Sequence, residues 1–482
     1  MGRPDLLNRT LGFAGSVAIA VGGLAAGALP ERDPFAHWPV IRELRAFPLV
    51  AIAGTYVGLA LLCGAWLRLR RSLDDHSPGE LIRTLLCWAA PLALVPPMFS
   101  QDVYSYLAQG AMVHEGLDAY KFGPSMLGGH FAADVPTIWQ NTPAPYGPLF
   151  LRASAAVVNL TGNNVVAGVL AFRLIALIGI ALVVACLPGI ASRLGVSPQR
   201  ALWFGALNPL LLLHLVAGMH NDALMVGLMT AGVYLAVRRQ PAIGAALIGA
   251  AALIKAPAAL ALVTVVVLNP KAFARIGAAA AASFAGLQLA SGLGIGWIGA
   301  MKTPTSVRNG LSFSTDLGML LGALGWPGPM QFIRTFAAVV GCLLACWALV
   351  RAANPVAGLG LALSSVILLG PVVHPWYLLW AFVPLAAGLQ RIPQAAVWGS
   401  VGLALFLLPT GAPGYPEAVV AASIGTVAGL LYLRMRPPME AGVPLSPALT
   451  PALASPLTPA LTPPLASSLA PSLASAQRVA AR

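Results

Sequence analysis

The chain has 482 residues, of which 58% are hydrophobic and only 9% are charged. Soluble globular domains carry about a quarter charged residues, so this composition excludes a water-soluble fold. The formal net charge is +13, but the Lys and Arg residues form short clusters between apolar runs rather than one basic stripe. We therefore expect membrane lipids, and no nucleic acid, around this protein.

Apolar runs long enough to cross a bilayer recur along most of the chain. A spanning helix needs about 20 mostly apolar residues, and this criterion predicts an all-α polytopic membrane protein of about twelve spans. The first run follows Arg3 and Arg9 and is long for a signal peptide, so we predict an uncleaved helix there. The predicted spans are residues 11–29, 48–67, 81–99, 165–190, 201–218, 221–237, 272–293, 328–350, 356–373, 376–390, 394–410 and 417–433.

The basic clusters predict the orientation of the spans, because loops rich in Lys and Arg face the cytoplasm. Both termini are then inside, and the long polar loops 100–163 and 294–327 face outward. Arg32, Arg42 and Arg45 lie in the first outer loop and oppose this assignment without reversing the total. The residues that mark the cytoplasmic side are Arg3, Arg9, Arg68, Arg70, Arg71, Arg83, Arg193, Arg200, Arg238 and Arg239.

Residues 241–268 form an apolar stretch with basic residues at both ends, Arg239 and Lys271. Such a stretch should enter the membrane and return on the same side. Lys255 and Pro257 would form its apex, since proline breaks the helix there. Irregular backbone at membrane depth is tolerated only beside protein or a water-filled cavity, so we predict a re-entrant hairpin next to a polar cavity.

Two regions of different character divide the chain. Residues 1–436 hold all the apolar runs and are predicted to form one transmembrane domain. From residue 437 the sequence becomes loose repeats of Pro, Ala, Leu, Ser and Thr. Frequent prolines prevent these leucines from forming a span, so residues 437–482 are predicted to be a disordered cytoplasmic tail.

The long outer loop opens with residues 100–106, Ser-Gln-Asp-Val-Tyr-Ser-Tyr. Asp102 lies within one turn of the membrane surface, beside Tyr104 and Tyr106. An aspartate there either caps the helix that follows or supplies a catalytic carboxylate, and one residue could do both. The same loop ends with the cluster Pro145-Tyr146-Gly147-Pro148, which either starts a helix or presents Tyr146 to a sugar.

Four motifs together resemble one family of enzymes. Residues 100–106 and 145–149 resemble the first outer loop of the polyprenol-phosphate-mannose-dependent α-1,6-mannosyltransferases, the MptA and MptB branch of the GT-C superfamily. Residues 218–224, Gly-Met-His-Asn-Asp-Ala-Leu, and 374–377, His-Pro-Trp-Tyr, are also similar to that branch. The resemblance covers about residues 80 to 435. Leu117-Asp118-Ala119-Tyr120 departs from the Asn-Pro-Tyr of many relatives.

The resemblance implies a GT-C-type helical bundle with a long extracytoplasmic catalytic loop, 100–163. It also implies transfer of mannose, with inversion, from polyprenyl-phosphate-mannose to a mannan glycolipid of lipomannan type outside the cytoplasmic membrane. Asp102 would be the general base, a role typically worth about 10² to 10⁴ in rate. The resemblance implies neither a cofactor nor a metal.

A donor phosphate needs cationic or hydrogen-bonding partners. Arg173 lies within an apolar run, where a charge indicates function by default, although its side chain could also snorkel to the interface. Lys255 at the hairpin apex is a second candidate, unless it only caps a helix end. His374 is a third, on the strength of the resemblance. Two more cations, Lys302 and Arg308, lie in an outer loop and could meet lipid phosphates or simply be solvated.

His220, Asn221 and Asp222 begin a helix on the outer side. Adjacent residues do not share a helix face, so this group is a poor metal site, and we predict that it binds acceptor hydroxyls together with Tyr104, Tyr106 and Tyr146. A transferase for another sugar or linkage is the nearest alternative. A lipid or sugar transporter would instead show internal repeats and a midplane site, whereas here polar residues gather on one side. A scaffold would need no such residues.

Overall fold

The computed structural model describes residues 3–303, 307–308, 310–412 and 414–435. The tail predicted for residues 437–482 lies outside the described residues. Helices are the only regular elements in the described part of the chain. Proline occupies the first turn of many of them, where its missing N–H is not needed.

The helices follow one another with short connections, apart from the segment between α4 and α8. The α-helices are α1 (Arg3–Ala26), α2 (Pro39–Arg45), α3 (Pro48–Leu69), α4 (Pro78–Leu92), α5 (Asp102–His114), α6 (Gly129–Ala133), α7 (Pro148–Thr161), α8 (Val165–Arg193), α9 (Pro198–Gly205), α10 (Asp222–Val237), α11 (Pro241–Ala252), α12 (Leu260–Leu268), α13 (Phe273–Ser291), α14 (Gly296–Ala300), α15 (Phe313–Ala323), α16 (Pro329–Arg351), α17 (Pro355–Leu368), α18 (Leu378–Gly388), α19 (Gln394–Ala404) and α20 (Pro416–Met435). Shorter helical turns are η1 (Arg70–Asp75), η2 (Pro124–Met126), η3 (Leu211–Ala217), η4 (Ala256–Ala259), η5 (Pro270–Ala272) and η7 (Pro375–Tyr377).

The all-α polytopic fold predicted from the sequence is confirmed. Among the described residues, six helices are long and apolar enough to cross a membrane, and η3 with α10 would add a seventh as one bent span. Each predicted span coincides with helical structure. Several are shorter than expected, because prolines end them: α4 has 15 residues, contains Pro91 and is followed by Pro96 and Pro97.

The outer surfaces of the long helices are apolar, as a lipid environment requires. Only 11% of the apolar window in Pro270–Ser291 is buried, and only 28% of that in Pro416–Met435. On α16 the side chains of Phe332, Phe336 and Trp347 are exposed. Surfaces of this kind rarely face water, so the helices are built to contact lipid.

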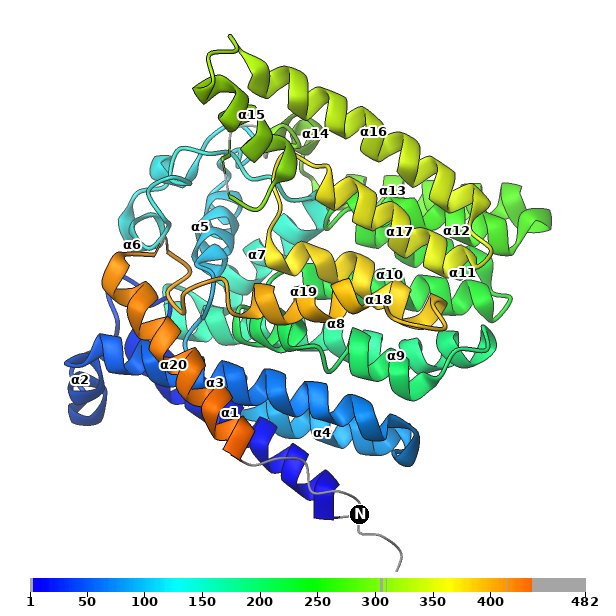
Figure 1. Ribbon diagram of the computed structural model, residues 1–482. Helices are drawn as coiled ribbons and strands as arrows, with labels where there is room; N and C mark the ends of the chain where they lie inside the picture. The colour runs from blue at the N-terminus through cyan, green and yellow to red at the C-terminus, as the bar shows by residue number, and fades with distance from the viewer. Residues whose placement is uncertain (1–2, 304–306, 309, 413, 436–482) are drawn as a thin grey trace, which may run out of the picture. The chain divides into compact units, whose positions relative to one another are not determined.

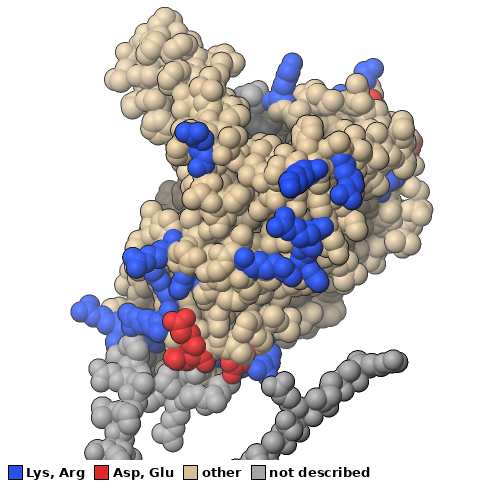
Figure 2. Space-filling view, turned by 90° about the vertical axis from the view of Figure 1, so that its right-hand side faces the viewer, with Lys and Arg blue, Asp and Glu red and all other residues tan. Residues whose placement is uncertain are grey.

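Most of the helices lie side by side, and α5, α6 and the loops around them gather at one end of the bundle (Figure 1). The turns that join α8 to α9, α10 to α11 and α16 to α17 lie at the opposite end. Figure 2 views that opposite end and shows Lys and Arg side chains spread across it, with a small acidic patch.

Small residues allow the central helices to pack closely. A Cβ added at Gly179 of α8 would meet the Ala223 carbonyl oxygen at 2.2 Å, and one at Gly227 of α10 would meet the Gly179 oxygen at 2.4 Å. Gly232 of α10 and Gly244 of α11 meet in the same way, with distances of 2.6 and 2.4 Å to the partner's oxygen. Close backbone approach of this kind is a common basis of helix association in membranes, and here it fixes the start of α10, which carries the candidate site.

Candidate active site

Asp102 is the first residue of α5 and is held in place by the non-helical segment before it. Phe99 has a left-handed φ of 63°, and its N–H donates to the Pro409 carbonyl at 2.8 Å. The segment also passes so close to Gly411 that a Cβ there would lie 2.6 Å from the Ser100 Cα. Strain of this kind in a non-glycine residue is commonly stored at functional sites.

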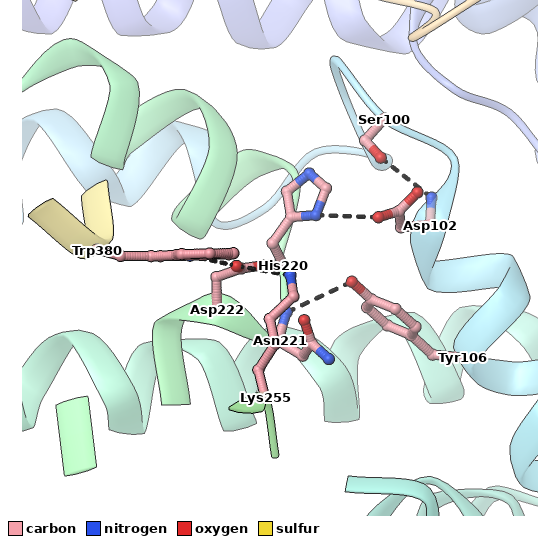
Figure 3. Close-up of polar contacts among 8 residues, drawn as sticks. All are labelled: Ser100, Asp102, Tyr106, His220, Asn221, Asp222, Lys255 and Trp380. Carbon is pink, nitrogen blue, oxygen red and sulfur yellow. Dashed lines mark hydrogen bonds and ion pairs between the residues drawn. The ribbon is translucent and has the colours of Figure 1, made fainter. Parts of the chain in front are cut away.

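The Asp102 carboxylate does not cap the helix, contrary to one of the two sequence interpretations. Gln101 occupies the N-cap position and makes no side-chain capping hydrogen bond. The Asp102 N–H donates to Ser100 Oγ at 3.1 Å. The carboxylate instead points across to another part of the chain, His220, with Oδ2 3.3 Å from the imidazole Nδ1 (Figure 3).

His220 reaches Asp102 because the helix that carries it is broken. The helices η3 and α10 meet at an angle of 112°, and the turn between them includes Met219 with a positive φ of 42°. The His220 N–H donates to the His214 carbonyl at 3.2 Å. Irregular backbone at such a break is tolerated where protein surrounds it, and it turns the His220 ring toward α5.

The Asp102 carboxyl is fully ionised at neutral pH. Burial by itself would raise the pKa of Asp102, but the hydrogen-bonding and electrostatic interactions with His220 outweigh burial and lower the pKa to about 2. Burial lowers the pKa of His374 to about 4, although the nearby Asp102 charge acts in the opposite direction. At pH 7 His374 is therefore neutral and Asp102 is an anion.

Lys255 lies between α11 and η4, in the extended turn predicted as the hairpin apex. Its ammonium lies 2.8 Å from Asp222 Oδ1, and the same oxygen accepts a hydrogen bond from Trp380 Nε1. The Asp222 side chain is 1% exposed and that of Lys255 is 14% exposed. The lysine charge is thus neutralised from behind while its ammonium remains open on one side.

The turn that holds Lys255 is tied to the long outer loop. The N–H of Gly147 donates to the Ile254 carbonyl at 3.0 Å, and that of Leu149 donates to Leu253 at 3.1 Å. A Cβ at Gly147 would lie 2.1 Å from the Leu253 oxygen, so only glycine fits there. These contacts place Tyr146 and Lys255 on one wall.

A stack of rings joins the charged residues. Trp376 lies between His220 and His374, with ring centroids 3.8 and 4.4 Å apart and interplanar angles of 21° and 10°. Tyr377 and Trp380 surround the other charged group, their ring centroids 4.5 and 5.0 Å from the Lys255 ammonium. The rings of Tyr377 and Trp380 are at cation–π distance from the Lys255 ammonium. The Trp376 ring packs against His220, the partner of Asp102.

These residues open onto a cavity of about 1900 Å³, larger than the roughly 300 to 1,000 Å³ of most small-molecule sites. Four of the predicted catalytic and binding residues line it: Asp102, Tyr146, Lys255 and His374. Much of the remaining wall is apolar and comes from α12, α17, α20 and the segment 405–408 that follows α19. One cavity therefore combines a charged, aromatic region with extended apolar walls.

The other predicted site residues do not line this cavity. His220, Asn221 and Asp222 are at most 2% exposed and lie behind Asp102 and Lys255, as Figure 3 shows. The Tyr106 hydroxyl accepts a long hydrogen bond of 3.5 Å from the Asn221 N–H. Direct contact of these residues with a sugar hydroxyl is therefore not supported by their positions.

The side chains of Tyr104 and Arg173 donate hydrogen bonds to backbone carbonyls and do not line the cavity. The Tyr104 hydroxyl donates to the Ala28 carbonyl at 2.6 Å. Arg173 is 3% exposed and donates to the carbonyls of Ala93 and Ala217 at 3.1 and 3.3 Å. Arg173 thus joins the end of α4 to the end of η3 and supports the broken helix, rather than snorkelling to an interface.

Sequence reasoning missed three cavity residues, Trp376, Tyr377 and Trp380. Residues 376 and 377 were noted only as part of the His-Pro-Trp-Tyr motif, without a role of their own. The spacing of Tyr377 and Trp380, three residues apart on one helical face, was the signal available. Among the residues that the structure describes, no three His, Cys, Asp or Glu side chains form a metal-binding group.

An all-helical membrane bundle with an ionised carboxylate, a paired lysine and stacked aromatic rings in one cavity has the architecture expected of a membrane glycosyltransferase. Comparison with known proteins agrees. Residues 9–271 match the family model described as Alpha-(1->6)-mannopyranosyltransferase, N-terminal domain, and residues 312–435 match the MptB C-terminal domain. The chain belongs to this alpha-(1->6)-mannopyranosyltransferase family, and the resemblance noted in the sequence is confirmed.

Three relatives of known name each cover at least 80% of this chain. A probable alpha-(1->6)-mannopyranosyltransferase of Mycolicibacterium smegmatis is 38% identical over 442 residues, covering 80% of this chain and 79% of the relative. Alpha-(1->6)-mannopyranosyltransferase A of Mycobacterium tuberculosis is 36% identical, with 84% and 85% covered. Alpha-(1->6)-mannopyranosyltransferase B of Corynebacterium glutamicum is 32% identical, with 88% and 79% covered. No solved structure matches this chain.

Proposed function

We propose that this protein is an inverting α-1,6-mannosyltransferase that moves mannose from polyprenyl-phosphate-mannose to a growing mannan glycolipid of the lipomannan and lipoarabinomannan type. The observation that carries the proposal is the ionised Asp102 carboxylate, held by His220 and facing the same cavity as Lys255. The names of the relatives support the sugar and the linkage.

In the proposed reaction an acceptor hydroxyl attacks the anomeric carbon of mannose. The new C–O bond forms as the bond from that carbon to the phosphate oxygen breaks, and Asp102 takes the hydroxyl proton. Polyprenyl phosphate leaves as an anion and needs no acid. A carboxylate with a pKa near 2 is a weak base in the empty cavity, but a phosphate anion bound nearby raises a carboxyl pKa, which strengthens Asp102 when the donor is present.

The remaining cavity residues have supporting roles in this proposal. Lys255 and His374 lie on the wall where the leaving phosphate would be held, the lysine as a cation and the neutral histidine as a hydrogen-bond donor. Tyr146 and Trp376 offer flat faces on which a sugar can stack. His220 positions Asp102, and Asp222 positions Lys255. The apolar walls are suited to the prenyl chain of the donor.

The active site would face the extracytoplasmic side of the cytoplasmic membrane. Two features support this orientation. The cavity is lined by loop residues such as Thr137 and Trp139, which belong to the end of the bundle that holds α5 and α6 (Figure 1). The opposite end carries the basic side chains seen in Figure 2, as the cytoplasmic face of a membrane protein does.

The test compares the detergent-purified protein with an Asp102→Asn variant. Both receive radiolabelled polyprenyl-phosphate-mannose and a short α-1,6-mannoside, and label in the acceptor is counted. Removal of a general base should lower the rate at least about a hundredfold. Asp118→Asn is the matched control, because Asp118 is an exposed carboxylate of the same outer loop whose Oδ1 accepts the Tyr120 N–H at 2.9 Å, and it should keep the parental rate.

Each result bears on a different part of the proposal. If only the Asp102 variant loses transfer activity, the enzyme class, the donor and the base are supported together. Equal activity of both variants would leave the transferase standing and remove Asp102 as the base. A folded parent protein that transfers nothing would overturn the donor assignment.

A further inference from the structure

A phosphate anion at the cavity wall needs a positive charge that is not already offset by a neighbouring carboxylate. Of the described residues that line the cavity, three carry a formal charge: Asp102, Lys255 and Arg308. Asp102 is an anion, and the charge of Lys255 is offset by Asp222 at 2.8 Å. With His220 counted as neutral, this wall has a net negative charge without Arg308, which would repel a phosphate anion.

His374 does not remove this deficit. Its pKa is lowered to about 4 by burial, so at neutral pH it can donate a hydrogen bond but contributes no positive charge. Arg173 is buried and occupied by the carbonyls of Ala93 and Ala217. A cation from another element is required if the cavity binds a phosphate.

Arg308 is available for that role. It lies on the segment between α14 and α15, is exposed and lines the cavity. Within the described part of the chain no hydrogen bond or ion pair engages its guanidinium. A guanidinium presents a planar fork of donors that matches phosphate oxygens.

The backbone beside Arg308 is anchored rather than free. Arg334, which is 7% exposed, donates to the Val307 carbonyl and through Nε to the Thr315 hydroxyl at 2.9 Å. That hydroxyl in turn donates to the Pro371 carbonyl at 2.6 Å.

The same end of α15 is fixed to the chain before His374 by a second set of contacts. Ser312 and Ser314 donate to the Gly370 carbonyl at 2.8 and 3.0 Å. The segment that carries Arg308 and the segment that leads to His374 are therefore joined by one hydrogen-bonded network, with both side chains on the cavity.

We propose that Arg308 binds the phosphate of the polyprenyl donor, forming with Lys255 and His374 a phosphate site at the cavity wall. This inference rests on the proposed function for the identity of the ligand. Arg308 supplies the uncompensated positive charge, Lys255 supplies a cation held by its aromatic cage, and His374 supplies a neutral donor. Arg334 positions Arg308 through the Val307 carbonyl and does not itself touch the phosphate.

Binding of radiolabelled polyprenyl phosphate to the full-length protein in detergent tests the proposal, with the uncharged polyprenol of equal length as the comparison ligand. Arg308→Gln should weaken binding of the phosphate by about 10- to 100-fold, the range expected for charge-assisted hydrogen bonds. Binding of the polyprenol should stay unchanged. Arg308→Lys keeps the charge but loses the planar fork, so its affinity should be intermediate.

Lys302→Gln is the matched control. The substitution removes one positive charge from the same loop, but Lys302 does not line the cavity. The affinity of this variant for polyprenyl phosphate should therefore equal that of the parent. Competition with inorganic phosphate and with phosphatidylinositol separates the possible sources of the phosphate group. Polyprenyl phosphate should displace the label far better than either competitor.

Different outcomes overturn different claims. A folded Arg308→Gln variant with parental affinity for polyprenyl phosphate removes Arg308 from the site and leaves the proposed function intact. An effect of Arg308 on phosphatidylinositol alone would assign this cation to a phospholipid and refute the donor role. If the parent protein prefers the polyprenol to its phosphate, both this inference and the proposed donor fail.

Discussion

His220 Nδ1 and Asp102 Oδ2 lie 3.3 Å apart, although one residue belongs to the break before α10 and the other to the start of α5. The His220 ring is completely buried and stacked on Trp376 at 3.8 Å, so its orientation is fixed. The contact is the main reason why the pKa of Asp102 is lowered despite burial. His220 is therefore a positioning residue whose effect can be measured through Asp102.

Replacing His220 by Phe should move the acid limb of the pH–activity profile to higher pH. Phe keeps a flat ring against Trp376 but removes the polar contact, so the pKa of Asp102 rises from about 2. A carboxylate base is active above its pKa, and activity should then fall at a higher pH as the medium is acidified. The measurement is kcat/KM of mannosyl transfer between about pH 4 and 8.

His214→Phe is the control for this profile. His214 also lies beside Trp376, at 5.4 Å between ring centroids, but it makes no direct contact with Asp102. Its variant should keep the parental acid limb. An unchanged limb in His220→Phe would show that His220 does not set the ionisation of Asp102.

Substitutions of Lys255 and Asp222 should have strongly non-additive effects on the free energy of unfolding. Asp222 is nearly inaccessible and Lys255 is partly open to the cavity. Lys255→Met therefore leaves a buried carboxylate unpaired, a change that typically costs about 3 to 5 kcal/mol. Asp222→Asn should cost less, because the lysine can turn toward the cavity.

The double variant Asp222→Asn with Lys255→Met should be more stable than Lys255→Met alone, since no unpaired charge remains. Thermal unfolding in detergent, with all four proteins in one double-mutant cycle, gives the coupling. Additive losses would mean that the ion pair contributes no interaction energy of its own.

Gly147→Ala should disrupt the wall formed by Tyr146 and Lys255. The added methyl group would lie 2.1 Å from the Leu253 carbonyl oxygen, so the loop must move away from the hairpin. We expect a lower melting temperature and at least a tenfold loss of transfer, because displacement of about 1 Å can cost about a hundredfold in rate.

Gly294→Ala provides the comparison, since a Cβ at Gly294 meets no atom within 4 Å. That variant should melt and react like the parent. Equal behaviour of the two alanine variants would show that the close contact at Gly147 is not required.

Acidification should destabilise the folded protein through His374. Burial lowers its pKa from the ordinary 6.5 to about 4, so the unfolded chain binds this proton more readily than the folded chain. Stability contributed by the neutral ring is complete above about pH 6.5 and is lost progressively as the pH falls toward 4.

His374→Gln cannot titrate and should therefore show a flatter dependence of melting temperature on pH in that window. Melting curves of parent and variant at half-unit intervals of pH measure the difference. If both slopes agree, His374 is not held neutral by its surroundings.

The sequence predicted much of the fold, because membrane crossing depends on local composition. Runs such as 165–190 and 328–350 are apolar along their whole length, and both are long helices in the structure. The turn at Lys255 and the loop carboxylate Asp102 were also singled out from the sequence. A cation and an anion placed beside apolar runs are unusual enough to indicate a site, and both line the cavity.

Local sequence patterns did not predict the contacts that some of these residues make. Asp102 at the start of a helix has the sequence signature of a cap, yet Gln101 takes that position, because the carboxylate is drawn to His220. Arg173 has the signature of a functional intramembrane charge, yet its two terminal nitrogens donate to backbone carbonyls. Arg308 has the signature of a solvated loop cation, and only its position on the cavity distinguishes it.

By itself the sequence determined that this chain crosses a membrane many times, which segments do so, and which family it belongs to, because hydropathy and short motifs are properties of neighbouring residues. Only the tertiary structure decided which polar residues meet. Asp102 pairs with His220, and Lys255 pairs with Asp222. Those partners are distant in the chain, and they are brought together by the break before α10, the turn after α11 and the glycine contacts between helices. No local pattern encodes such contacts, since they depend on how whole helices pack.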